Sequence, residues 1–169
     1  MVRVLVVVAS RHGATGEIGA AVASALTEEG IESEVQAPER VAGVDGFDAV
    51  IIGSGVYVGH WLEAAKGFIN RHEAALRQRP VWLFSSGPLG DPPAPIAEPI
   101  DVAPLVEITA ARGHRIFAGR LAKDELGFGE RALVKMVRAP YGDYRDWPEI
   151  AEWAHEIAGG LTAPAPLGR

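Results

Sequence analysis

The chain has 169 residues, a length that fits a single domain of ordinary size. Apolar residues make up 48% of it and charged residues 22%, so it can bury a core and does not have the composition of a disordered chain. Its 16 lysines and arginines stand against 22 acidic residues, for a net charge of −6. Because no basic block is dense enough to neutralise a run of phosphates, nucleic acid is not an expected partner.

The sequence contains no cysteine. This excludes disulfide scaffolds, thiolate metal sites and cysteine nucleophiles, so redox chemistry would need a bound cofactor. The apolar run at residues 4–9 is too short for a signal-peptide core, and no stretch reaches the ~20 apolar residues of a membrane helix. We therefore expect a cytoplasmic protein without a transmembrane segment.

The first third of the chain alternates strand and helix patterns. Residues 2–8 are rich in valine and apolar at both odd and even positions, as in a parallel strand covered on both faces. A shorter, half-exposed strand is predicted at residues 31–36, and a fully apolar strand at residues 49–52, ending at Gly53. Between the first two strands, apolar residues recur with the spacing of an amphipathic helix that stops near Gly30: Ile18, Ala21, Val22, Ala25 and Leu26.

The same alternation continues along the rest of the chain. A helix is predicted from Leu62 to Leu76, and a buried strand follows at residues 81–84. Residues 88–104 are rich in proline and predict an extended surface loop before any short helix. The last predicted elements are a strand at residues 115–118 and a helix at residues 150–161.

Strands that alternate with helices favour a parallel sheet with right-handed crossovers. We therefore predict a three-layer, doubly wound α/β fold formed by one domain at residues 1–161, and a frayed, proline-rich tail at residues 162–169. In such sheets, ligands bind outside the carboxyl ends of the strands. The loops that follow the predicted strands are therefore the expected binding site.

The first of these loops leads from a buried strand into the start of a helix, and it contains Ser10, Arg11, His12, Gly13, Ala14 and Thr15. A helix start offers unpaired N–H groups and the positive end of its dipole, so it can hold a phosphate without a lysine. The alternative is that Ser10 and Thr15 only cap the helix. The dinucleotide fingerprint G-x-G-x-x-G and the P-loop sequence G-K-S/T are both absent, which excludes those two nucleotide classes.

The second loop combines glycines with large aromatic side chains, and its candidate binding residues are Ser54, Gly55, Val56, Tyr57, Val58, Gly59 and Trp61. The rings of Tyr57 and Trp61 could stack on a flat ligand, while glycines let the backbone approach its edge. The alternative is that both rings only cover the edge of the sheet. We favour a ligand because a candidate phosphate loop follows the neighbouring strand.

The third loop contains Ser85, Ser86, Gly87, Pro88 and Leu89. Taken alone it is typical of an ordinary turn, but three such loops at the ends of successive strands together indicate a ligand site. No catalytic residue is assigned: His60 could act in proton transfer, although a histidine at a helix start is more often a cap or a surface residue. The scattered histidines predict no metal site, and no G-x-S-x-G motif supports a hydrolase.

A basic face is predicted near residue 135. Arg131, Lys135 and Arg138 recur at i, i+4 and i+7, and Leu133, Val134 and Val137 form an apolar stripe behind them. This face could contact an anionic membrane or an acidic partner, or it could simply be the solvated side of a helix.

The loops resemble those of the flavodoxin-like superfamily, whose phosphate loop reads roughly Ser/Thr-x-Thr/Asp-Gly-x-Thr and whose two later loops enclose FMN. Ser10, Gly13 and Thr15 match this pattern, whereas His12 stands where those proteins usually have a hydroxyl or an acid. More narrowly, residues 53–61, residues 117–121 and the pair Asp146-Trp147 look like the menaquinone-dependent protoporphyrinogen oxidase family. The resemblance covers residues 2–158 and implies a flavodoxin-like five-stranded sheet with the strand order 2-1-3-4-5.

The resemblance implies FMN as the cofactor, with electrons or hydride accepted at flavin N5 and no protein nucleophile or metal required. Residues 122–145 are shorter and less basic than the corresponding insertion of that oxidase, so substrate specificity does not carry over with the cofactor. We predict an FMN-binding oxidoreductase that acts on a protoporphyrinogen or quinone-linked substrate. The alternatives are a non-catalytic electron carrier between protein partners, and a module that kept the fold and lost the cofactor.

Overall fold

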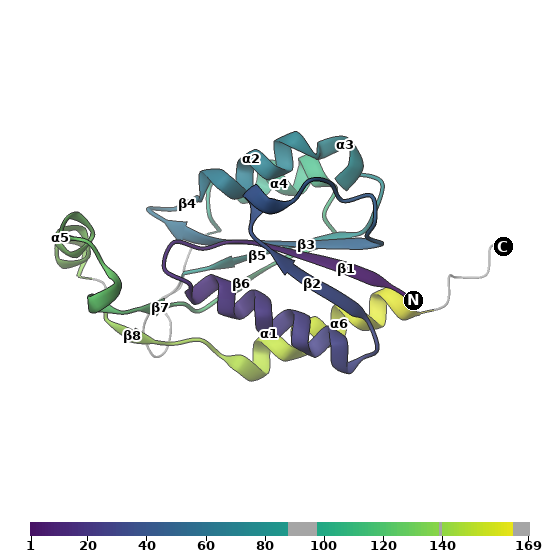
Figure 1. Cartoon of the computed structure of the whole chain (residues 1–169). Coiled ribbons are helices and arrows are strands. Elements are labelled where there is room, and N and C mark those ends of the chain that lie inside the picture. The colour runs from purple at the N-terminus through teal and green to yellow at the C-terminus, as the bar shows by residue number, and fades with distance from the viewer. Residues whose placement is uncertain (88–97, 139, 164–169) are drawn as a thin grey trace.

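The computed structural model describes residues 1–87, 98–138 and 140–163. This part of the chain forms three layers, in which a parallel sheet lies between two layers of helices (Figure 1). The parallel strands follow the order β2-β1-β3-β5-β6, which confirms the predicted order 2-1-3-4-5. Their bounds are β1 (Arg3–Ala9), β2 (Glu32–Gln36), β3 (Ala49–Tyr57), β5 (Val81–Ser86) and β6 (Gly113–Phe117).

Helices cover both faces of the sheet, and β1 explains why its sequence is apolar throughout. Its odd and even positions enter two different apolar clusters, of which one contains Val4, Val6 and Val8 and the other Leu5, Val7 and Ala9. Because side chains alternate along a strand, a strand that is covered on both faces is apolar at every position. The first cluster lies under α1 (Ala14–Glu28) and α6 (Trp147–Thr162), and the second under α2 (Glu63–Arg71), α3 (Glu73–Leu76) and α4 (Val102–Thr109).

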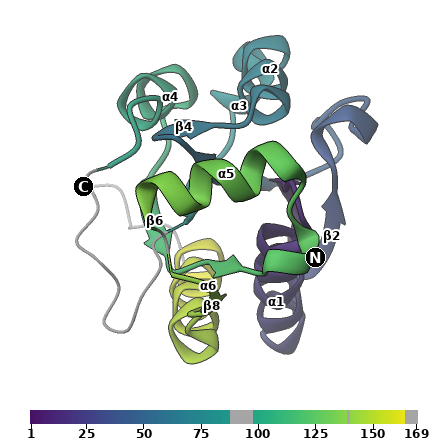
Figure 2. The same ribbon diagram turned by 90° about the vertical axis from the view of Figure 1, so that its left-hand side faces the viewer.

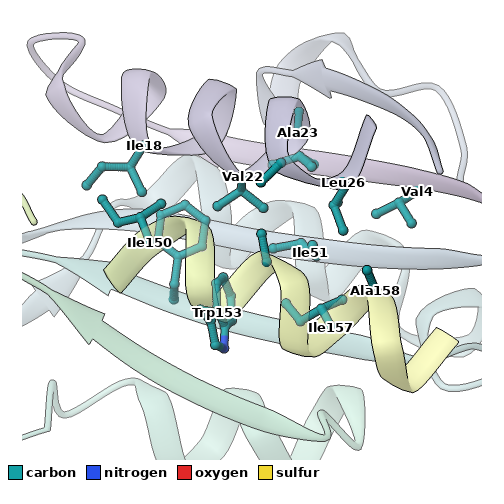
Figure 3. Packing of buried hydrophobic residues seen from close by; sticks show 14 of the residues in the cluster. Val4, Ile18, Val22, Ala23, Leu26, Ile51, Ile150, Trp153, Ile157 and Ala158 are labelled. Atoms are coloured by element: carbon teal, nitrogen blue, oxygen red, sulfur yellow. The ribbon is translucent and has the colours of Figure 1, made fainter. Parts of the chain in front are cut away.

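An aromatic group anchors the core beneath α1 and α6, where aliphatic side chains surround Trp153 (Figure 3). Phe84, Phe117 and Trp153 pack with their ring centres 5.4 to 5.9 Å apart. The ring of Phe84 lies against Gly53 on the neighbouring strand, where an added Cβ would come within 2.1 Å of it. Position 53 therefore needs glycine because a side chain there would collide with the core.

The prediction that the third strand ends at Gly53 is wrong, since β3 continues to Tyr57. Gly53 and Ser54 pair with β1 on one side and β5 on the other, and this pairing outweighs the low strand propensity of glycine. A tight turn at Val58 and Gly59 then leads into β4 (His60–Trp61), which pairs antiparallel with β3. The predicted second loop is therefore a β-hairpin.

Other elements also differ from the predictions. The helix predicted from Leu62 to Leu76 is interrupted at His72, which separates α2 from α3. In the proline-rich stretch, α4 begins at Val102, so Pro104 lies in the first helical turn, where its missing N–H is not needed. A short 3₁₀ turn, η1 (Pro38–Arg40), follows β2, and α6 reaches Thr162 at the start of the predicted tail. Residues 88–97 and 164–169 lie outside the described residues.

After β6 the chain leaves the sheet and forms a separate substructure at the carboxyl end of the strands. It contains β7 (Arg120–Leu121), the 3₁₀ turn η2 (Lys123–Glu125), α5 (Phe128–Val137) and β8 (Gly142–Asp143), and β7 pairs antiparallel with β8. Figure 2 shows α5 crossing in front of this end of the sheet, between the two layers of helices. Residues 120–143 are termed the cover segment below.

Candidate functional site

A cavity lies at the carboxyl ends of β1, β3 and β5, between the sheet and the cover segment. Parts of all three predicted loops line it, namely Ser10, Arg11, His12, Ala14, Thr15, Gly55, Val56, Tyr57, Ser86 and Gly87. The remaining wall is missing from the predicted site residues and consists of Leu62, Gly119, Arg120, Leu121, Leu126, Glu130, Leu133 and Val134. The structure therefore brings the three loops together on one cavity and adds a wall from the cover segment.

The first loop presents backbone N–H groups at the start of α1. Gly13 is the N-cap residue and has a φ of +88°, a left-handed conformation that side chains disfavour. Its own N–H donates to Oγ of Ser10 over 3.0 Å, so Ser10 holds the loop and does not cap the helix. No side chain in the described part of the chain caps the first turn of α1, which leaves its N–H groups and the helix dipole available to an anion.

Two basic side chains of this loop meet a carboxylate from α5. Nε2 of His12 lies 2.7 Å from Oε2 of Glu130, and Nε of Arg11 lies 3.8 Å from the same oxygen. The hydrogen bond with His12 lowers the pKa of Glu130, although burial opposes this shift. The guanidinium of Arg11 also lies over the ring of Tyr57, 4.3 Å from its centre. Glu130 therefore links the cover segment to the first loop, and Arg11 links that loop to the hairpin.

The hairpin turns through two residues that both have positive φ, 51° at Val58 and 79° at Gly59. This is the pattern of a type I′ turn, and it is strained at Val58 because valine is β-branched. The carbonyl of Gly59 accepts a hydrogen bond from the N–H of Ile100 over 3.1 Å, which ties the turn to the chain before α4. Tyr57 lines the cavity, whereas Val58 and Gly59 do not.

Asp101, the N-cap residue of α4, holds the base of the hairpin. Its Oδ2 accepts the N–H of Trp61 over 2.9 Å and lies 3.1 Å from Nδ1 of His60 and 3.6 Å from Nζ of Lys66. Burial would raise the pKa of Asp101, but the hydrogen bonds from Trp61 and His60 lower it overall. His60 faces this carboxylate and does not line the cavity, so its position gives no support to a role in proton transfer.

Trp61 also lies away from the cavity. Its side chain is buried in the core beneath α2 and α4, where its indole N–H donates to Oγ of Ser85 over 2.8 Å. The same Oγ lies 2.7 Å from Nε2 of His114, whose Nδ1 is 3.3 Å from Oε1 of Glu98. The expectation that Trp61 flanks a planar ligand does not fit this position, because the core encloses the ring. Trp61 and Ser85 instead fix the end of β5 below the cavity.

The other predicted residues surround the cavity without lining it. Ser54 is buried, donates to the carbonyl of Gly55 and accepts the N–H of Leu62 over 3.0 Å, so it holds the two strands of the hairpin at their base. Gly13 does not line the cavity. It is the N-cap residue of α1 and directly precedes the helical N–H groups that have no side-chain cap. Pro88 and Leu89 lie outside the described residues.

The floor of the cavity is backbone, because Gly55, Gly87 and Gly119 meet there. An added Cβ at Gly87 would come 3.2 Å from Cβ of Val56, and one at Gly119 would come 3.3 Å from Cα of Gly87. At Gly55 an added Cβ would lie 3.2 Å from Oγ1 of Thr15. Side chains at these positions would fill the cradle, so the glycines leave a surface on which a flat group fits.

The cover segment provides a wall of mixed character. Leu126, Leu133 and Val134 make it apolar, while Arg120 adds a cation whose Nη2 lies 2.8 Å from Oε1 of Glu125. The Nε of Arg120 is buried and has no hydrogen-bond partner among the residues that the structure describes. A buried donor without a partner is costly, and here it lies in a residue that lines the cavity.

Arg145 attaches the cover segment to α1. Its side chain is only 4% exposed, and its guanidinium forms two hydrogen bonds with the carboxylate of Asp143, of 2.8 and 2.7 Å. It also donates to the carbonyl of Ala14 over 3.2 Å and pairs with Glu17. These contacts lower the pKa of Asp143 and of Glu17, mainly through the hydrogen bonds from Arg145. The pair of β7 and β8 is therefore fixed beside the first turn of α1.

Within residues 1–87, 98–138 and 140–163, no group of three or more His, Asp or Glu side chains could hold a metal ion. Among the helices in those same ranges, none has both the length and the apolar character needed to cross a membrane. The first loop gives the cavity N–H groups and cations, and the cover segment gives it a largely apolar wall that also carries Arg120 and Glu130.

Comparisons with known proteins agree with this architecture. The Flavodoxin domain model matches residues 5–147. The chain is 25% identical over 171 residues to protoporphyrinogen IX dehydrogenase (quinone) of Escherichia coli K12, covering 92% of this chain and 94% of that protein. A flavodoxin from the domain Archaea superposes with a TM-score of 0.66 at 16% identity, covering 95% and 99% of the two chains. Two-electron reduced Megasphaera elsdenii flavodoxin gives 0.58 at 19% identity, over 90% and 98%. This chain therefore belongs to the flavodoxin domain family, whose fold implies the binding of a flavin.

Proposed function

We propose that this chain binds FMN in the cavity and acts as an FMN-dependent oxidoreductase on a protoporphyrinogen or quinone-linked substrate. The observation that carries the proposal is the division of the cavity into a donor side and an apolar side over a glycine floor. FMN combines an anionic phosphate with a flat ring system, and these two halves match the two sides of the cavity.

The residues that would hold each half of the cofactor follow from this division. The N–H groups at the start of α1 and the hydroxyl of Ser10 would hold the phosphate, with Arg11 and His12 beside them. The glycine floor and Tyr57 would contact the ring. When bound, FMN supplies transfer of electrons or hydride, which the side chains of this cysteine-free chain do not provide.

The cover segment would exclude water and shape the approach to the ring. Leu126, Leu133 and Val134 close the cavity on the side away from the sheet. The guanidinium of Arg120 would add a positive charge beside the bound group, since Arg120 lines the cavity. Arg145 keeps this wall in place through its contacts with Asp143 and α1.

The substrate class is proposed from the Escherichia coli relative, whose name specifies a protoporphyrinogen and a quinone and which aligns along nearly its whole length. Both compounds are built around largely apolar rings, and the apolar wall suits such molecules. The flavodoxin neighbours support a second candidate, an electron carrier between protein partners. The cover segment favours the first, because α5 crosses the end of the sheet that a docking protein would need to approach (Figure 2).

The experiment has two stages. First, any small molecule that co-purifies with the protein is extracted and identified, and the protein is titrated with FMN by flavin fluorescence. We expect a yellow protein or tight uptake of added FMN, and no uptake at concentrations of about 1 μM would overturn the cofactor. Second, steady-state turnover is measured with protoporphyrinogen IX as donor and a quinone as acceptor. Turnover by the FMN-loaded protein alone supports the enzyme, whereas electron transfer only through a partner protein supports the carrier.

A further inference from the structure

The outer face of α5 is the side of this helix that does not line the cavity. The helical period of ~3.6 residues places Glu130, Leu133 and Val134 on the side that lines the cavity. The opposite side carries Phe128, which is 93% exposed, and Met136, which is 76% exposed, lies between the two sides. Large apolar side chains with this exposure on a helix that already buries its other face indicate a second contact surface.

Basic residues lie beside Phe128 on this helix. Lys123, Arg131, Lys135 and Arg138 surround a groove on the outside of the cover segment, together with Phe128 and Tyr141. All four basic residues are exposed, and none of them forms an ion pair with any residue in the described ranges. Of the four acidic residues of the cover segment, Glu125, Glu130 and Asp143 are turned toward Arg120, His12 and Arg145. The fourth, Asp124, is exposed and forms no ion pair among the described residues, so the four basic residues still outnumber it. This face is therefore locally positive on a protein whose net charge is −6.

We propose that the outer face of α5 docks on an anionic phospholipid surface, with Phe128 and Met136 entering the interface between headgroups and acyl chains and the flanking lysine and arginines contacting the headgroups. Apolar side chains framed by cations on one side of a helix are the features that bind helices parallel to such a surface. The helix also stands out from the rest of the molecule at the carboxyl end of the sheet (Figure 1), so a flat surface can reach it. The excess of negative charge elsewhere would orient the protein with this face toward the lipid.

A lipid surface fits these observations better than an acidic protein does. The exposed apolar residues lie on a projecting helix, whereas an acidic peptide would be held by the cations alone. The same helix separates the cavity from the proposed lipid surface, with Leu133 on its inner side and Phe128 on its outer side. The proposal does not depend on FMN, because lipid binding can be measured on the protein with and without the cofactor.

The test is co-sedimentation of the whole protein with vesicles of phosphatidylcholine mixed with phosphatidylglycerol, and with vesicles of phosphatidylcholine alone. We expect binding to the anionic vesicles, weakened by added salt, and little binding to the neutral ones. Replacing Arg131→Glu and Lys135→Glu together should lower the partition coefficient at least about 25-fold, since each basic residue near such a surface contributes about fivefold. Phe128→Ser should lower it about tenfold.

The matched control is the double variant Arg40→Glu and Arg71→Glu, which changes the net charge equally at exposed positions outside the cover segment. Its partition coefficient on the anionic vesicles should stay within about twofold of that of the original protein. Thermal unfolding and FMN titration of every variant separate lipid binding from folding and from the proposed function. Equal binding to neutral vesicles, an equal loss in the control, or binding to polyglutamate without binding to vesicles would each overturn the proposal.

Discussion

Glu130 on α5 and His12 in the first loop lie 2.7 Å apart across 118 positions of sequence, and this pair closes the cavity between the sheet and the cover segment. Arg11 approaches the same carboxylate to 3.8 Å. Glu130 therefore places one negative charge beside two basic side chains of the first loop. A phosphate held at that helix start would share these two residues with a carboxylate of its own charge sign.

This arrangement predicts that Glu130→Gln tightens FMN binding. The substitution keeps the shape of the side chain but removes a negative charge that would repel the phosphate. We expect the dissociation constant to fall about fivefold, equivalent to ~1 kcal/mol for charges that remain partly exposed. Fluorescence titration at low and high salt measures this effect, which should shrink as salt screens it. Glu34→Gln is the control because Glu34 is an exposed carboxylate on β2 that does not line the cavity, and unchanged or weaker binding by Glu130→Gln would contradict the prediction.

Gly13 and Gly30 offer a matched test of the phosphate loop. They lie at opposite ends of α1 with φ of +88° and +80°, and open space surrounds the Cβ position of each. Gly13→Val and Gly30→Val should therefore destabilise the protein equally, by about 1–2 kcal/mol, because both force a side chain into the left-handed region. Only Gly13→Val should weaken FMN, by at least about tenfold, since it displaces the N–H groups at the helix start. Urea unfolding and FMN titration measure the two effects, and equal FMN affinities would refute the phosphate assignment.

The layers were predictable because they depend on local patterns, whereas the strand order was implied by the resemblance to flavodoxin-like proteins. The valines of β1 are apolar on both faces, and that alone indicates a strand between two layers. The extent of β3 was not predictable in this way. Gly53 is typical of a turn in sequence, but here it leaves room for the ring of Phe84 on a strand that is adjacent only in the folded sheet.

The location of the candidate site was also predictable, since the carboxyl ends of parallel strands meet at one edge. Which residues line the site was harder to predict. Trp61 and Tyr57 look alike as candidate stacking residues, yet Trp61 is buried against Ser85 while Tyr57 faces the cavity. The wall from the cover segment depends on contacts such as Glu130 with His12 that no local pattern encodes. The feature of the sequence that pointed to this wall is the apolar stripe behind the basic face of residues 131–138. Leu133 and Val134 of that stripe line the cavity.

Arg145→Met should release the cover segment from α1. The side chain is 4% exposed, whereas Asp143 and Glu17 remain about half exposed and can be solvated again, so we expect a loss of about 2 kcal/mol, below the value for a fully buried pair. The pKa of both carboxylates is lowered in the folded protein, so their contribution is complete above the ordinary values near 4 and is lost as the pH falls below them. In urea unfolding, the free energies of unfolding of the original protein and of Arg145→Met should therefore differ strongly at pH 7 and little at pH 3. A difference that does not change with pH would contradict the ion-pair assignment.

We expect His114 to cause a second pH dependence of the free energy of unfolding, at higher pH. Burial lowers its pKa, although Glu98 opposes this shift, and its Nε2 accepts the hydroxyl of Ser85 only when the ring is neutral. The folded protein therefore resists protonation of a group that the unfolded chain protonates near pH 6.5, so the free energy of unfolding should fall as the pH decreases from about 6.5 toward 5. His114→Gln should remove this decrease, while His155→Gln, which alters an exposed histidine, should retain it. Denaturant titrations across this range test the prediction above the pH at which the carboxylates titrate, and a decrease that survives His114→Gln would assign it to another group.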